Sequence, residues 1–146
     1  IAGALVFNYV ITIENIPKTL SVMLKAYDLS PLSFLLAVNV LLLVLGCFLE
    51  GTTILLIIIP VLLPTAQALG IDPVHFGIIM VVNMEVGMCH PPVGLNLYVA
   101  SGITKMGITE LTVAVWPWLL SMLCFLVVVT YWPGLSLWLP KAVGII

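Results

Sequence analysis

Two adjacent prolines, Pro91 and Pro92, lie inside a long apolar stretch and constrain the fold more than any other feature. A proline has no N–H, and in a helix its ring clashes with the carbonyl one turn earlier. The residue before a proline is also disfavoured in the α-helical backbone region. An apolar helix that reaches this pair must therefore break. Several backbone groups between 87 and 94 then lose their helical partners.

Composition makes such a break costly. The chain of 146 residues is 63% hydrophobic and 7% charged, with a mean hydropathy of +1.33, whereas soluble domains are about 25% charged. We therefore expect an all-α transmembrane protein. In hydrocarbon, an unpaired backbone group is costly unless protein, water or an ion satisfies it. Secondary transporters build ion and substrate sites from broken helices near the membrane midplane, which is our working hypothesis.

Charge and cysteine content narrow the function classes. Four Lys, no Arg and six acids give a net charge of −2, so nucleic-acid binding has no electrostatic basis. The three cysteines, Cys47, Cys89 and Cys124, have apolar neighbours and no paired spacing, which predicts buried thiols. The chain begins in mid-pattern at Ile1, so we expect residues 1–146 to be a piece of a larger polypeptide or one part of a complex.

The first part of the chain predicts a helix end followed by a membrane-surface segment. Residues 1–13 are apolar but shorter than the roughly 20 residues that a transmembrane helix needs, so we expect the end of such a helix. Residues 14–31 are mixed in polarity, and four of their apolar positions recur at three- and four-residue spacing: Leu20, Met23, Leu24 and Tyr27. This spacing favours an interfacial amphipathic helix, with a simple polar loop as the alternative.

Residues 32–69 place a polar centre, 46–53, between two apolar arms of 10 to 14 residues. Arms of that length are more typical of a re-entrant segment than of a span. The centre contains Glu50, and an acid at membrane depth is by default a functional candidate. Two topologies stay open at this point. One is a single span with an interrupted middle, and the other is a helical hairpin that enters and leaves on one side.

The second half predicts a broken helix and a last span. Asp72 is a suitable N-cap with Pro73 at the first helical position, so the broken helix covers 73–103. The last span covers 111–139, with a kink at Pro117. Four tryptophans lie near its ends, as in the aromatic belts of membrane proteins: Trp116, Trp118, Trp132 and Trp138.

The stretch 83–96 carries the sharpest functional hypothesis. Carbonyl oxygens freed by a helix break supply the oxygen ligands that a hard cation such as sodium prefers, without burying a charge; a proton site is also open. A proline kink that serves only packing is the alternative. The flanking Asn83, Gly87, Gly94 and Asn96 favour the site.

Several other polar residues have two interpretations each. Glu85 could relay a proton or hold a cation, or form a hydrogen bond that serves packing only. Glu50 has the same two interpretations. Thr52 and Thr53 could bind a carboxylate at a helix N-terminus, or only cap their own helix. We expect His75 at the membrane interface near a helix start, without a role.

Metal-centre and enzyme interpretations are disfavoured. Met88, Cys89 and His90 are soft ligands, but consecutive residues rarely converge on one ion, and no second Cys/His cluster completes a shell. A catalytic dyad of Cys89 and His90 lacks an orienting group that the sequence can place. We therefore expect no enzymatic activity.

Four motifs resemble the large membrane subunit of a tripartite ATP-independent periplasmic (TRAP) transporter. They are a G-x-F-x-D/E tip at Gly46, Phe48 and Glu50, a P-x-x-x-P pair at Pro60 and Pro64, L-G-I-D-P-V-H-F-G in full at 69–77, and N-x-x-x-G-x-x-T-P-P-V-G-x-N-L-Y at Asn83, Gly87, Pro91, Pro92, Val93, Gly94, Asn96, Leu97 and Tyr98. The match runs from about residue 39 to 140. It implies the C-terminal half of that subunit, the second of two inverted repeats.

The resemblance implies an elevator-type secondary transporter fold. The tip of a re-entrant hairpin at 46–53 and the helix break at 87–94 would move together against a scaffold, and they would hold one Na⁺ ion. The implied ligands, mostly through backbone oxygens, are Gly46, Gly87, His90 and Val93. The common family residue at position 90 is Thr. Its hydroxyl can add a ligand, so His90 either contributes only its carbonyl, alters the site or serves the substrate.

The resemblance also implies a function and partners. We expect a multi-pass permease subunit in the bacterial inner membrane that imports an organic acid anion, in the first place a C4-dicarboxylate, by sodium symport. A periplasmic substrate-binding protein, a small membrane (Q) subunit and the N-terminal half of the same subunit would be its partners within the lipid bilayer. A sialic-acid-type permease, an elevator-type transporter without a binding protein and a non-transporting scaffold are the alternatives. The candidate substrate-binding residues are Glu50, Gly51, Thr52, Thr53 and Asn96.

Overall fold

The computed structural model describes residues 2–26 and 30–144, which form eight α-helices and no strand. The helices are α1 (Ala2–Ile13), α2 (Ile16–Ala26), α3 (Pro31–Gly46), α4 (Gly51–Ala68), α5 (Pro73–Met88), α6 (Leu95–Thr104), α7 (Ile108–Tyr131) and α8 (Pro133–Ala142). The predicted all-α fold is confirmed for these residues. Tyr27, one of the residues of the predicted interfacial helix, lies outside them.

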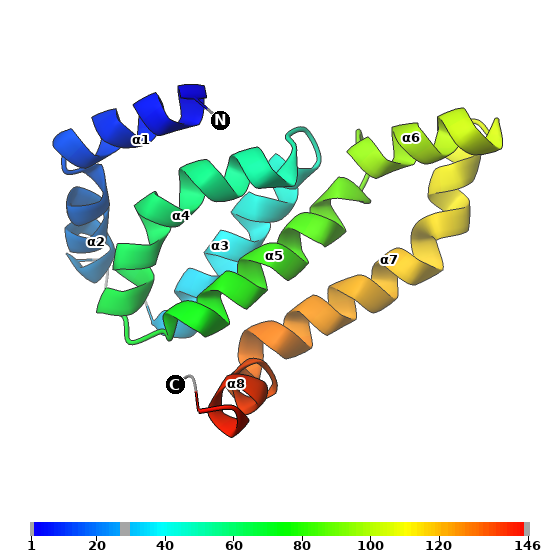
Figure 1. Ribbon diagram of the computed structural model, residues 1–146. Helices are drawn as coiled ribbons and strands as arrows, with labels where there is room; N and C mark the ends of the chain where they lie inside the picture. Colours follow the sequence, from blue (N-terminus) through cyan, green and yellow to red (C-terminus); the bar gives the residue numbers. More distant parts are fainter. Residues whose placement is uncertain (1, 27–29, 145–146) are drawn as a thin grey trace.

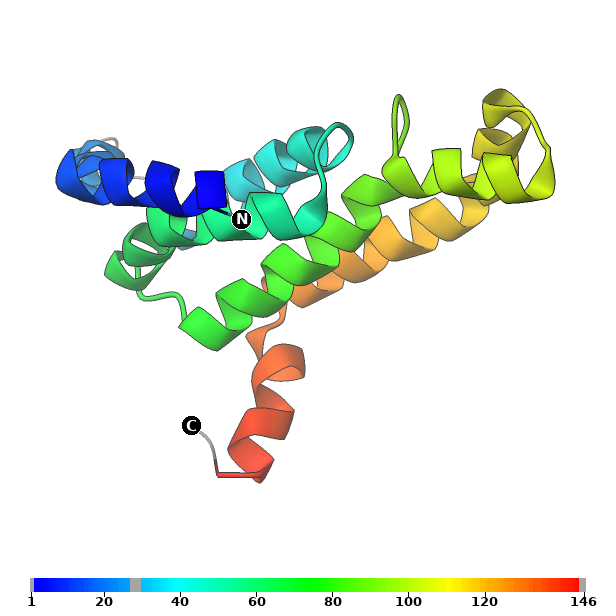
Figure 2. The ribbon, with the colours of Figure 1, turned by 45° about the horizontal axis from the view of Figure 1, so that its top comes forward.

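The helices α3 and α4 form a hairpin, and α5 runs beside α3 in the same direction (Figure 1). Beyond a loop, α6 leads away from α5, and α7 returns alongside both. The helices α1 and α2 pack on α4, while α8 turns away from the end of α7 (Figure 2). The hairpin tip and the α5–α6 loop therefore lie at the same end of the bundle.

The start of α5 follows the predicted capping pattern. Asp72 Oδ1 accepts the N–H groups of Val74 and His75 at 2.8 and 3.2 Å. Pro73 occupies the first helical position, where a missing N–H leaves no gap in the helix. This cap fixes where α5 begins and hence which residues reach the break at its other end.

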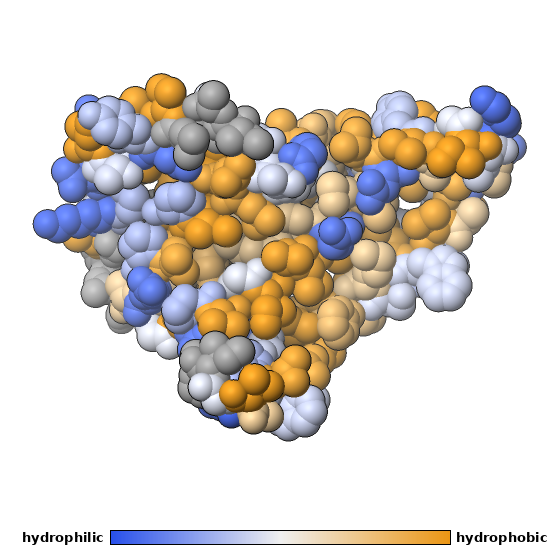
Figure 3. All heavy atoms as spheres, viewed as in Figure 1, coloured by the Kyte–Doolittle hydropathy of each residue, from blue (hydrophilic) through white to orange (hydrophobic). Residues whose placement is uncertain are grey.

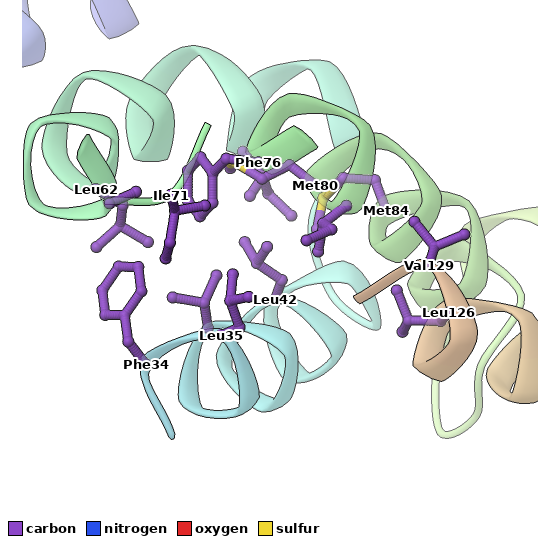
Figure 4. Packing of buried hydrophobic residues seen from close by; sticks show 14 residues of the cluster. Phe34, Leu35, Leu42, Leu62, Ile71, Phe76, Met80, Met84, Leu126 and Val129 are labelled. Atoms are coloured by element: carbon purple, nitrogen blue, oxygen red, sulfur yellow. The ribbon is translucent and has the colours of Figure 1, made fainter. Parts of the chain in front are cut away.

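The core lies between α3, α4, α5 and the end of α7 (Figure 4). Its labelled members are Phe34, Leu35, Leu42, Leu62, Ile71, Phe76, Met80, Met84, Leu126 and Val129. In a membrane, lipid tails are as apolar as these side chains, so helices are held by close packing and hydrogen bonds rather than by the hydrophobic effect. Contacts that join helix backbones and polar side chains are therefore the informative ones.

Much of the outer surface is apolar (Figure 3). By length and composition alone, α4 and α7 could each cross a membrane, and α3 and α5 are shorter apolar helices. The 18 residues of α4 correspond to about 27 Å, more than the arm length expected from sequence. The two helices form a hairpin rather than one straight span, but helix length does not decide whether this hairpin is re-entrant, which stays a prediction.

The expectation of one helix over 111–139 is wrong. The helix α7 ends at Tyr131, and α8 begins at Pro133. Pro133 has no N–H for the preceding turn, and the residue before a proline is disfavoured in the α region. Trp132 accordingly has φ −121° and ψ 82°. Pro117 lies inside α7, which changes direction in its yellow part (Figure 1).

The expectation that all three thiols are buried is wrong for Cys124. Cys47 is buried and Cys89 half-buried, but Cys124 is exposed, because α7 is buried through the face that carries Leu119 and Leu126. His75 lies near the start of α5, as expected, and is only 3% exposed, because the end of α7 and α8 pack against α5. Its position at the membrane interface stays a prediction.

Candidate functional site

The hairpin tip and the helix break meet at a glycine pair. Gly46 ends α3, Gly87 lies in the last turn of α5, and both are buried. A Cβ on Gly46 would lie 3.0 Å from the Gly87 Cα atom, and one on Gly87 would lie 2.9 Å from the Gly46 Cα atom. Only glycine at both positions lets the two backbones approach this closely. Two of the four predicted sodium ligands are therefore in direct backbone contact.

At the break, helical hydrogen bonds are lost and one backbone hydrogen bond to the tip is formed. In a continuous helix the residues at 91 and 92 would donate to the Gly87 and Met88 carbonyls, but both are prolines. The Gly94 N–H, which would serve the His90 carbonyl, donates instead to the Cys47 carbonyl at 3.1 Å. The Gly87 carbonyl still accepts the His90 N–H at 3.0 Å. The His90 carbonyl thus loses its helical donor to the tip, and Met88 loses its donor to proline.

The freed carbonyl groups converge beside Gly94, which has φ +55°. A Cβ there would lie 3.0 Å from the His90 oxygen and 3.2 Å from the Met88 oxygen. The Leu97 N–H donates to the Gly94 carbonyl at 2.8 Å, and within the described chain no backbone N–H outside the helices donates to the Val93 carbonyl. These neutral oxygens fit a hard monovalent cation. Met88 was not among the predicted ligands.

The His90 imidazole turns towards the tip. Its Nδ1 lies 3.5 Å from Cys47 Sγ and is hydrogen-bonded to the Pro91 carbonyl. The Cys47 thiol donates to the Leu43 carbonyl at 3.1 Å and lies 3.6 Å from the Pro91 carbonyl. Ring and thiol thus join break and tip, while the His90 carbonyl oxygen lies beside Gly94, 3.0 Å from the position of a Cβ there. The geometry is compatible with a carbonyl ligand at position 90.

A cavity of about 330 Å³ lies beside this contact. Its walls are formed by Val40, Leu43, Val44, Cys47, Phe48, His90, Pro91 and Pro92. None of these side chains carries a fixed positive charge, so the cavity by itself offers no counter-charge for a dicarboxylate.

The predicted substrate residue Glu50 is engaged in a local cap. Its carboxylate accepts the N–H groups of Thr52 and Thr53 at 2.7 and 2.9 Å and the Thr53 hydroxyl at 3.1 Å. The start of α4 therefore already holds a carboxylate, which is the capping alternative stated above. A substrate carboxylate that used these N–H groups would have to displace Glu50.

The other predicted site residues are spread around the tip and break. Gly51 is buried against α5, since a Cβ there would lie 3.4 Å from Met84 Cβ. Asn96 is exposed, and its Nδ2 donates to Cys89 Sγ at 3.5 Å; no hydrogen bond between described residues joins it to 50–53. Glu85 is exposed, and its side chain forms no hydrogen bond with the described residues. Both interpretations of Glu85 stay predictions.

Sequence reasoning missed a buried polar contact between helices. Asn39 of α3, Asn83 of α5 and Thr130 of α7 are hydrogen-bonded to one another in the core. In the sequence, Asn83 stands out only as a neighbour of the break. The signal for this contact is Asn39, the single amide in the apolar arm before Gly46.

A family model described as the DctM component of the tripartite ATP-independent periplasmic transporter matches residues 1–135. The chain belongs to this family. The predicted family resemblance is thereby confirmed. Since its named members are permeases, the family is one of membrane transport proteins rather than enzymes.

Curated relatives differ in the substrates for which they are named. The chain is 62% identical over 144 residues to the C4-dicarboxylate TRAP transporter large permease protein DctM of Rhodobacter capsulatus, covering 99% of this chain and 33% of the relative. It is 42% identical over 134 residues to the isethionate TRAP transporter permease protein DctMQ of Oleidesulfovibrio alaskensis (92% and 21%). It is 38% identical over 141 residues to the sialic acid TRAP transporter large permease protein SiaM of Vibrio cholerae (97% and 33%). The chain spans a third or less of these relatives.

Proposed function

We propose that the chain is part of the large permease of a sodium-coupled transporter that imports organic acid anions across the bacterial inner membrane. A periplasmic substrate-binding protein would deliver the anion, and the small Q subunit and the remainder of the large subunit would complete the membrane complex. The re-entrant hairpin and the broken helix would hold Na⁺ between them. They would move together as the elevator.

The meeting of tip and break carries this proposal. Carbonyl oxygens of His90 and Met88 lie 3.0 and 3.2 Å from the position of a Cβ on Gly94, and Gly46 and Gly87 are in backbone contact with each other. Neutral oxygens at a helix break are the ligands that secondary transporters use for sodium. The Gly94–Cys47 hydrogen bond favours movement of α3 and the break as one body.

The substrate class rests on the relatives. Identity is 62% to a permease named for C4-dicarboxylates and 38% to one named for sialic acid. We therefore propose a C4-dicarboxylate, with Thr52, Thr53 and Asn96 as candidate contacts and Glu50 as a group that the anion must displace.

The test is uptake of labelled succinate into proteoliposomes that contain the complete membrane complex. Binding protein is added outside, with an inward sodium gradient or with potassium in place of sodium. We expect uptake only when sodium and binding protein are both present. Labelled sialic acid and isethionate under the same gradients measure selectivity.

Two results would contradict the proposal. Succinate uptake that is sodium-dependent without binding protein would indicate an elevator-type transporter that works alone. Uptake of sialic acid but not succinate would overturn the substrate class while leaving sodium coupling in place.

A further inference from the structure

A buried chain of hydrogen bonds joins three helices near the candidate site. Asn83 of α5 donates through Nδ2 to the Asn39 side-chain oxygen at 2.8 Å and to the Asn39 carbonyl at 3.1 Å. Asn39 of α3 donates through Nδ2 to Thr130 Oγ1 at 2.8 Å. Thr130 of α7 donates its hydroxyl hydrogen to the Leu126 carbonyl at 2.7 Å. Asn39, Asn83 and Thr130 are 7%, 0% and 1% exposed.

The number of hydrogens on each side chain fixes which group donates and which accepts in this series of hydrogen bonds. Thr130 has one hydroxyl hydrogen, and Leu126 receives it, so Asn39 must present its NH₂ group to Thr130. The Asn39 side-chain oxygen then faces Asn83, which must present its own NH₂ group. At the start of this series of hydrogen bonds, Asn83 Oδ1 is buried and has no hydrogen-bond partner among the described residues. The three side chains therefore have one mutual arrangement that satisfies the links.

Apolar residues surround the three hydrogen-bonded side chains, so these side chains are packed against groups that cannot replace their hydrogen bonds. Leu42, Met80, Met84, Leu126 and Val129 are buried between the same three helices (Figure 4). If α3 slid along α5, Asn39 and Asn83 would be left unpaired in apolar surroundings. A single buried polar pair can set the register of packed helices for this reason.

The same helix pair carries the site. Asn39 precedes Gly46 by seven residues on α3, and Asn83 precedes Gly87 by four on α5, distances of about 10 and 6 Å along the helices. A slip of α5 by one turn, about 5.4 Å, would bring Asn83, four residues before Gly87, opposite Gly46, where a side chain cannot fit. The register of α3 against α5 therefore decides whether the tip and the break can meet.

We propose that Asn39, Asn83 and Thr130 are positioning residues that set this register and thereby hold the carbonyl oxygens of tip and break in place for the cation. The inference rests on the proposed function, since it names how the sodium site is positioned. None of the three touches the site directly. Thr130 is tested first because it lies at the end of the hydrogen-bond series farthest from Asn83. Its substitution also leaves the sequence of the α3–α4 hairpin unchanged.

The experiment compares variants of the complete membrane complex in proteoliposomes, with binding protein present. Thr130→Val keeps the shape of the side chain and removes the hydroxyl, while Thr130→Ser keeps the hydroxyl. Thr112→Val is the matched control, because Thr112 lies on the same helix and donates only to the Ile108 carbonyl one turn before it, at 2.8 Å. Sodium concentration for half-maximal succinate uptake is measured, together with the succinate KM at saturating sodium.

We expect Thr130→Val to raise the half-maximal sodium concentration about five-fold, the effect of one lost hydrogen bond. The succinate KM of Thr130→Val at saturating sodium should stay within about two-fold of the wild-type value. The half-maximal sodium concentrations of Thr130→Ser and Thr112→Val should also stay within about two-fold of the wild-type value. A Thr130→Val complex with unchanged sodium dependence would overturn the inference. So would a Thr130→Ser complex that is as impaired as Thr130→Val.

A second measurement tests sodium binding without transport, so that a variant with poor folding or insertion can still be assessed. For each purified complex, the increase in unfolding temperature on addition of sodium is recorded, and Asn83→Leu is included. We expect the sodium-induced increase to shrink in Thr130→Val and Asn83→Leu; equal increases in all variants would contradict the inference. A wild-type complex that shows no sodium dependence in either measurement would instead contradict the proposed function.

Discussion

At the scale of single residues, Gly94 links the helix break to the hairpin. In a continuous helix its N–H would donate to the His90 carbonyl, but here it donates to the Cys47 carbonyl at 3.1 Å. The two prolines predict that helical bonds break there, because their missing donors can be read from the sequence. The new partner of Gly94 could not be predicted, because Cys47 is distant in the sequence and only the packing of α3 on α5 brings it near.

Gly94→Ala tests this junction. The backbone at φ +55° costs an alanine about 1–2 kcal/mol, and its Cβ would lie 3.0 Å from the His90 oxygen. We expect sodium-dependent succinate uptake to fall at least about tenfold, which corresponds to 1.4 kcal/mol. Gly102→Ala in α6 is the control, since a Cβ at Gly102 meets nothing within 4 Å. Equal activity of both variants would show that Gly94 has no special place in transport.

At the scale of helices, a side chain of α1 repairs a proline gap in α4. Pro60 lies inside α4 and cannot donate to the Leu56 carbonyl one turn before it. Asn8 Nδ2 of α1 donates to that carbonyl at 2.6 Å. The proline therefore creates an acceptor in mid-helix that a neighbouring helix can use, which makes it a docking point for α1.

A double-mutant cycle measures this bond. Asn8→Ala should destabilise the complete subunit by about 1–3 kcal/mol, because the Leu56 carbonyl is left without a donor. Pro60→Ala restores an N–H that can serve Leu56 within α4, so Asn8→Ala should cost less in that background. Apparent unfolding temperatures of the four purified proteins give the comparison. Equal losses in both backgrounds would mean that Asn8 acts on α4 in another way.

Helix positions were the most predictable part of the fold, and contacts between helices the least. Asp72 and Pro73 define the start of α5 because capping is local chemistry. The break at Trp132 has a local cause too, because Pro133 ends the helix there, but the apolar pattern continues through this proline and favours one long helix. Asn39 and Thr130 differ in kind, since their partners come from other helices and no spacing along the chain reveals them.

At the scale of the whole molecule, α7 presents an apolar face that no described helix covers. Val113, Leu120 and Val127 recur every seven residues on one side of α7, and they are 72%, 47% and 55% exposed. A soluble protein rarely keeps such a surface uncovered. Membership of a family of membrane permeases accounts for it, because lipid or the remainder of the large subunit would cover this face.

A charge at the middle of α7 tests that account. Leu120→Lys should reduce insertion of the complete subunit, since a central lysine costs about 2.5–3.5 kcal/mol in a transmembrane helix. Thr109→Lys, an exposed position at the start of α7, should have little effect because a terminal lysine reaches the headgroups. The fraction that resists alkaline extraction from membranes gives the readout. Full insertion of Leu120→Lys would mean that α7 does not face lipid.

The contact of Gly46 with Gly87 has a genetic consequence. A side chain added at either position meets the backbone of the other, and no residue smaller than glycine exists to make room. The two sites therefore cannot compensate for each other, unlike paired core positions, where a large residue can be balanced by a small one. We therefore expect function lost by substitution of either glycine to return only when glycine itself is restored or when the two helices move apart, whichever ion the site holds.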